Sequence, residues 1–122
     1  MNDILDIDKL KESLNSFAKI RKWEKFHSPK NLSMAIAGEA GELLELFQWL
    51  TEQASIDLKK DIVLKEKISY ELADIILYTI QMASQLNINL NEAVLNKMII
   101  NNNKYPASQV KGSAKKYTEY SK

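Results

Sequence analysis

Two pairs of carboxylates are the side chains in this sequence best suited to chemistry. Glu39 and Glu42 lie three positions apart, and so do Glu71 and Asp74. Three residues of an α-helix turn through about 300°, so the acids of each pair project from one face, one above the other. Four ionised carboxylates in a partly desolvated site repel one another, and a hard divalent cation relieves that repulsion. The pattern therefore indicates a Mg²⁺ site, with Mn²⁺ as a substitute.

Both pairs lie in apolar stretches, and Gly38, Ala40 and Gly41 leave room beside the first pair. A cation held there would collect a nucleoside triphosphate, polarise a phosphoryl oxygen and orient a water for attack. A single acidic pair is usually a solvated helix face. Two pairs leave two interpretations open, an enzyme site and a non-catalytic helical oligomerisation module with solvated acids. The chain has no cysteine and one histidine, which argues against structural zinc.

Helices must position these acids, because turn residues are sparse and alternating strand patterns are nearly absent. We expect an all-α fold of four main helices in a single domain, residues 1–122, with an extended tail from about residue 104. The helices are expected from about Ile7 to Lys25, from Ser28 or Asn31 to about Glu52, from about Ile62 to Leu86, and from Asn89 to the residue before Tyr105. Asp6 and Asn89 are the predicted caps of the first and last helix. The polar connection 54–60 is expected to be partly helical.

The segment 72–80 is apolar on nearly every side of its helix. A monomer of 122 residues rarely buries a helix all round, so we expect a subunit interface there.

Composition narrows the class of protein. Net charge is +1, and no block of Lys and Arg suggests a nucleic-acid surface. No apolar run reaches the roughly 18 residues of a membrane span. The acidic N-terminus lacks the apolar core of a signal peptide. A cytoplasmic protein with neither a membrane nor a nucleic-acid partner is expected.

At the acidic pairs the sequence resembles a known family. Glu39-x-x-Glu42 followed by Glu71-x-x-Asp74 resembles the metal-binding signature of the MazG-like all-α nucleotide pyrophosphohydrolases. Further blocks are similar to the branch that contains the animal dCTP pyrophosphatase and the integron-associated bacterial MazG proteins. These blocks are Trp23–Leu32, Gly38–Leu43, Glu45–Trp49, Lys97–Met98, Asn101, Lys104–Pro106 and Gly112–Thr118.

The resemblance implies a helical bundle completed by oligomerisation, as a tetramer built from dimers. It also implies Mg²⁺ held by Glu39, Glu42, Glu71 and Asp74, as the catalytic residues. The implied reaction splits a (deoxy)nucleoside triphosphate between the α and β phosphates, with a water activated by the metal, to the monophosphate and pyrophosphate. The implied role is nucleotide-pool housecleaning. Gly38 stands where the broader family often has glutamate, which argues against a second, fully bound metal ion.

The same resemblance places other residues at the substrate. They are His27, Lys30, Trp23, Trp49, Tyr78, Asn101, Lys115, Lys116 and Tyr117. Trp23 and Trp49 would wall a planar base, because aromatic faces stack on any nucleobase.

From pattern alone each of these residues also has a plainer role. His27 would be a surface or capping residue, Tyr78 a core residue, and Lys30 and Asn101 helix-end residues. The tail residues would be a disordered basic end, whereas the resemblance has them close over substrate, from the same or a neighbouring subunit. The base stays open among dCTP, dUTP, dATP and a broad set.

Overall fold

The computed structural model describes residues 5–114, and over that span the chain is helical and contains no strand. The elements are α1 (Ile7–Ile20), η1 (Glu24–Phe26), α2 (Pro29–Glu45), α3 (Glu52–Asp57), η2 (Leu58–Lys60), α4 (Ile62–Gln85), α5 (Leu90–Lys104) and α6 (Ala107–Val110). The all-α prediction is confirmed. The chain forms two compact units that divide between Ile88 and Asn89. That residues 1–122 make a single domain stays a prediction.

α1 begins where the sequence predicts. The Asp6 carboxylate accepts a hydrogen bond of 3.1 Å from the backbone N–H of Lys9. The predicted end at Lys25 is wrong, because Lys22 adopts a left-handed φ of 56°. The N–H of Trp23 then donates to the Ala18 carbonyl at 2.9 Å, and the N–H of Lys22 to the Lys19 carbonyl at 3.1 Å. This pair of bonds is a Schellman ending, and it turns the chain away from the helix axis.

α2 begins with Ser28 as cap and Pro29 in the first helical position. The Ser28 hydroxyl accepts from the N–H of Asn31 at 3.2 Å. Of the two predicted caps Ser28 is therefore the one used, and the Asn31 amide instead donates to the Phe26 carbonyl at 3.1 Å. The predicted end of this helix at Glu52 is wrong. α2 stops at Glu45, and after a run of turns Thr51 caps α3 by accepting from the N–H of Ala54 at 3.1 Å.

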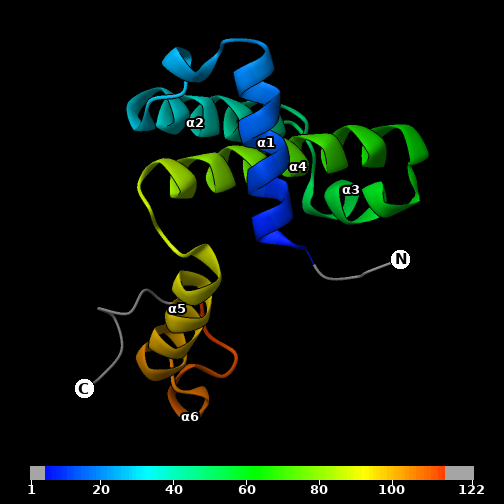
Figure 1. Cartoon of the computed structure of the whole chain (residues 1–122). Coiled ribbons are helices and arrows are strands. Elements are labelled where there is room, and N and C mark those ends of the chain that lie inside the picture. Colours follow the sequence, from blue (N-terminus) through cyan, green and yellow to red (C-terminus); the bar gives the residue numbers. More distant parts are fainter. Residues whose placement is uncertain (1–4, 115–122) are drawn as a thin grey trace. The chain divides into compact units, whose positions relative to one another are not determined.

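The first unit is a packed set of three long helices. α2 packs along α4, and α1 contacts α4 (Figure 1). Among residues 5–114 the buried apolar side chains are Ala18 on α1, Leu32 on α2, and Ile80 and Ala83 on α4. This small core fixes α2 against α4, and thereby fixes the acids that the two helices carry.

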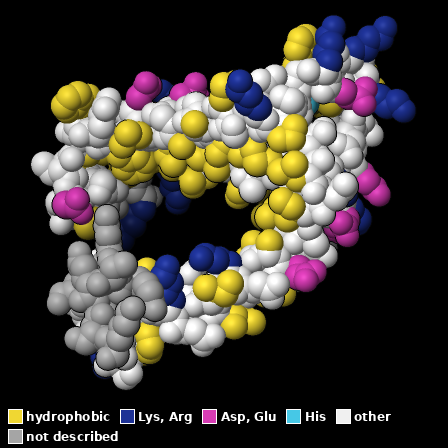
Figure 2. Space-filling model, turned by 90° about the vertical axis from the view of Figure 1, so that its left-hand side faces the viewer, with side chains coloured by type: hydrophobic (Ala, Val, Ile, Leu, Met, Phe, Trp, Pro, Cys, Tyr) yellow, Lys and Arg dark blue, Asp and Glu magenta, His cyan; other side chains and the backbone are white. Residues whose placement is uncertain are grey.

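α4 matches its predicted extent, and Asp61 caps it by accepting from the N–H of Leu64 at 3.0 Å. Its segment 72–80 has apolar side chains on the surface, with Leu72 48% and Ile76 41% exposed. Figure 2 shows hydrophobic side chains gathered in patches on the face in view. No helix in the described part of the chain is long and apolar enough to cross a membrane.

The second unit begins with α5. Asn89 caps this helix, as predicted, by accepting from the N–H of Glu92 at 3.1 Å. α6 lies in the stretch that the sequence assigned to an extended tail.

Candidate functional site

Three of the four predicted acids come together between two packed helices. Glu39 and Glu42 lie on α2, and Glu71 lies on α4. Each offers one carboxylate oxygen, and these oxygens all lie within 4.8 Å of one another. The packing of α2 on α4 thus builds a compact cluster of hard oxygen ligands.

Two oxygens of this cluster have no partner. Oε2 of Glu39 and Oε2 of Glu71 are shielded from solvent, and neither accepts a hydrogen bond from the described residues. Facing acceptors of this kind need either a proton or a cation between them. Carboxylate oxygens are the ligands that Mg²⁺ prefers, so the residues present fit such an ion.

The pKa of Glu39 reports the same crowding. Once it is protonated, Glu39 can donate a hydrogen bond to the Glu71 carboxylate, and this bond, burial, and the charges of Glu42 and Glu71 raise that pKa from 4.5 to about 7. At neutral pH the cluster on its own therefore holds a proton for part of the time. A divalent cation would offset the same negative charge more fully.

Asp74 does not belong to this oxygen cluster. It is exposed, one helical turn beyond Glu71, and it lines a cavity of about 360 Å³. Tyr78 lines the same cavity. Burial raises the pKa of Tyr78 most, followed by the charges of Glu39, Asp74 and Glu42. The carboxylates of Glu39 and Glu42 lie close enough to Tyr78 to raise its pKa, so the cavity that Tyr78 lines is next to the acidic cluster.

This cavity has aromatic and apolar walls. Its lining residues are Leu14, Phe17, Trp23, His27, Asp74, Leu77, Tyr78 and Gln81. The Schellman ending of α1 places Trp23 edge-on to Phe17, with ring centroids 5.8 Å apart and planes at 71°. Trp23 also lies edge-on to His27, with ring centroids 6.5 Å apart and planes at 78°. A half-open pocket with aromatic walls next to clustered acids suits a planar ligand that carries phosphates.

Three of the predicted substrate residues, Trp23, His27 and Tyr78, therefore share one cavity. Other predicted residues lie elsewhere. Trp49 is 88% exposed in the turn after α2, and Lys30 is exposed in the first turn of α2. Asn101 is exposed on α5, in the second unit. Lys115, Lys116 and Tyr117 lie outside the described residues. The part of every predicted site residue in binding or catalysis stays a prediction.

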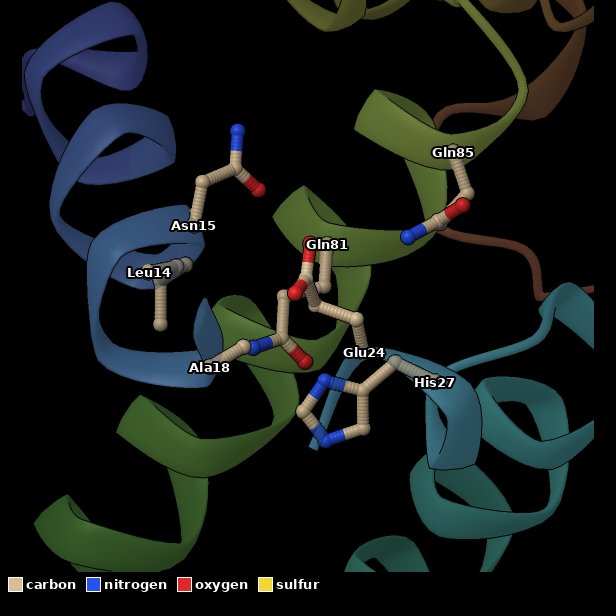
Figure 3. A pocket seen from close by; sticks show the side chains of 7 residues that line it. All are labelled: Leu14, Asn15, Ala18, Glu24, His27, Gln81 and Gln85. Carbon is tan, nitrogen blue, oxygen red and sulfur yellow. The ribbon is translucent and has the colours of Figure 1, made fainter. Parts of the chain in front are cut away.

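Among the polar residues that line this cavity, Gln81 is the one that the sequence analysis did not single out. It lines the large cavity and also a smaller one of about 60 Å³ (Figure 3). Its Oε1 is shielded from solvent and has no hydrogen-bond partner among the described residues. The signal was available, because Asp74, Tyr78 and Gln81 are spaced by four and then three residues, which places them on one helix face.

Known proteins resemble this chain in sequence and in structure. Residues 34–120 match the model of the MazG-like family. Human dCTP pyrophosphatase 1 is 42% identical over 103 residues, which cover 84% of this chain and 61% of the relative. The mouse dCTP pyrophosphatase 1 is 39% identical over the same shares. The matched region thus spans about three-fifths of the length of these relatives. The crystal structure of a pyrophosphatase from Archaeoglobus fulgidus superimposes with a TM-score of 0.76 at 34% identity, covering 87% of this chain and 97% of that one.

Proposed function

This chain belongs to the MazG-like family, and from that premise we propose that it is a magnesium-dependent nucleoside triphosphate pyrophosphohydrolase. The substrate we propose is dCTP or a related deoxynucleotide, and the products are the monophosphate and pyrophosphate. The observation that carries the proposal is the juxtaposition of the cluster Glu39, Glu42 and Glu71 with the aromatic cavity. One half of that arrangement suits phosphates and the other suits a base.

Glu39, Glu42 and Glu71 would hold Mg²⁺, with Asp74 at the border between cluster and cavity. When bound, the ion would supply positive charge to the phosphate oxygens and polarise the phosphoryl group. The unpartnered oxygens of Glu39 and Glu71 support this assignment.

The cavity would hold the base and the sugar. Trp23 offers a ring against which a base can stack, and Leu14, Phe17 and Leu77 add apolar surface to the lining. Tyr78 stands beside the carboxylates, where its hydroxyl can donate to a phosphate oxygen. Lys30, at the start of α2, is the lysine that we propose for phosphate contact. In this arrangement the base is fixed at one end and the reacting phosphate at the other, so binding orients the bond that breaks.

We further propose a homo-oligomer, a dimer of dimers, that works on the cytoplasmic nucleotide pool. The exposed apolar side chains Leu72 and Ile76 on α4 support an interface with another copy. Removal of excess or modified deoxynucleotides would be its role.

The test is a product assay. The purified protein is incubated with each common NTP and dNTP plus Mg²⁺, and the products are separated by chromatography. We expect monophosphate and pyrophosphate, with dCTP near the top of the ranking and no turnover in Glu42→Gln. Release of inorganic phosphate would mean that a different bond breaks. No cleavage with either Mg²⁺ or Mn²⁺ by the folded protein would end the proposal.

A further inference from the structure

Gln81 forms part of the wall between two cavities in the first unit. The large aromatic cavity and the small one have three lining residues in common, Leu14, His27 and Gln81. Figure 3 shows the Gln81 side chain extending from α4 into the space in front of His27. The remaining polar lining of the small cavity comes from Asn15, Glu24 and Gln85.

The carboxamide of Gln81 has an unmet hydrogen-bonding need. Its Oε1 is shielded from solvent and accepts from no described residue. A buried carbonyl oxygen without a donor destabilises the folded protein, so such an atom usually has a reason to be kept. A donor that arrives with a ligand would satisfy it.

The surroundings define what that ligand is. Trp23, Phe17 and Tyr78 provide aromatic walls, and Leu14 and Leu77 complete an apolar lining. A planar ring fits such walls by stacking, and its edge is then the part that presents polar groups. Within this lining the carboxamide of Gln81 is a group that can pair with the edge as both acceptor and donor.

We propose that Gln81 is a specificity-determining residue that contacts the edge of the nucleobase, with Oε1 accepting from an exocyclic amino group such as that of cytosine. This inference rests on the proposed function and deepens it. A base with a keto group at that place offers Oε1 no donor, so the carboxamide must turn over before it pairs. The structure thus favours an amino-bearing base over uracil.

The experiment compares dCTP with dUTP in the presence of Mg²⁺. Gln81→Met keeps the length of the side chain and removes its hydrogen-bonding groups. We expect kcat/KM for dCTP to fall about five- to tenfold, the loss that one hydrogen bond to an uncharged partner produces. For dUTP we expect less than a twofold change, with the same products. The matched control is Gln85→Met, one turn further along α4, which lines the small cavity and not the large one and should keep the wild-type ratio.

A binding measurement separates this inference from the proposed function. dCMP and dUMP are titrated without metal, and tryptophan fluorescence follows occupation of the cavity beside Trp23. We expect Gln81→Met to lose the preference of the wild type for dCMP. Gln81→Asn, which shortens the side chain by one methylene, should also lose the preference for dCMP. It replaces Gln81→Met in the experiment if circular dichroism shows that Gln81→Met is unfolded.

An unchanged dCMP to dUMP ratio in the folded variants would overturn the role of Gln81. If the wild type cleaves no triphosphate, the proposed function fails, and the mononucleotide titration still decides the role of Gln81.

Discussion

Glu39 on α2 and Glu71 on α4 approach each other with their Oε2 atoms shielded from solvent and unpaired. Two helices that pack through a small apolar core therefore meet at a point of electrostatic repulsion.

Mg²⁺ is expected to raise the melting temperature of the wild type, because it binds the folded cluster and not the unfolded chain. At a hundredfold excess over the dissociation constant such binding stabilises by about 2.7 kcal/mol. Glu71→Gln should abolish most of the gain, since it removes one anionic ligand. Glu66→Gln, at an exposed acid on the same helix, is the control and should keep the full gain. An equal Mg²⁺ effect in both variants would place the ion elsewhere.

Without metal, Glu39 is expected to make stability depend on pH. Its pKa is raised from 4.5 to about 7 by the hydrogen bond that the protonated form can make to Glu71, by burial and by the neighbouring charges. The folded state holds the proton more tightly than the unfolded chain. The contribution of Glu39 to the free energy of unfolding is therefore fully present below about pH 4.5 and is lost as pH rises through about 7. Melting temperatures in EDTA between pH 4.5 and 8.5 should show this loss, and Glu39→Gln should flatten it. A variant curve parallel to that of the wild type would contradict the assignment.

Trp23→Leu is expected to weaken binding of the base. Stacking of a base on an aromatic ring contributes about 1–3 kcal/mol, so KM for dCTP should rise roughly fivefold or more. Phe26→Leu is the matched control, because Phe26 is a 55% exposed aromatic of the same segment that does not line the cavity. Steady-state kinetics of both variants, with circular dichroism to verify folding, make the comparison. Equal KM values for Trp23→Leu and the wild type would remove Trp23 from the base site.

Gly41→Ala is expected to stabilise the isolated subunit. A Cβ built at Gly41 meets no atom within 4 Å, and alanine is favoured over glycine inside a helix by about 0.5–1 kcal/mol. Denaturant unfolding at low protein concentration and without Mg²⁺ measures the change. A destabilised variant whose oligomer dissociates more readily would show that another copy packs against this face of α2.

The starts of the helices could be predicted from sequence because their signals are local. Asp6 and Asn89 each act within three residues of themselves, as caps do. The predicted helix ends at Lys25 and Glu52 were wrong because no local signal in the sequence indicates the true ends. Lys22 takes a left-handed conformation that a lysine in the sequence does not predict, and there is no glycine at this position to indicate the end of the helix.

The candidate site was predictable in its acids and less so in its cavity. The spacing of Glu39 and Glu42 places both on one face of α2, so only the packing of α2 on α4 was needed to bring Glu71 to them. The spacing of Asp74, Tyr78 and Gln81 places the glutamine on the same helix face, but glutamine is usually a surface residue, and the shielding of its Oε1 depends on the packing of α1 against α4.

The cavity takes its two walls from distant parts of the chain, with the whole of α2 and α3 between His27 and Asp74. Closing that loop costs chain entropy before any contact between the walls repays it. Neither wall is a binding surface while α1 is undocked, so recognition of a base is a property of the docked state alone. A nucleotide bound in the cavity would thus contact both walls and slow the local unfolding of α1.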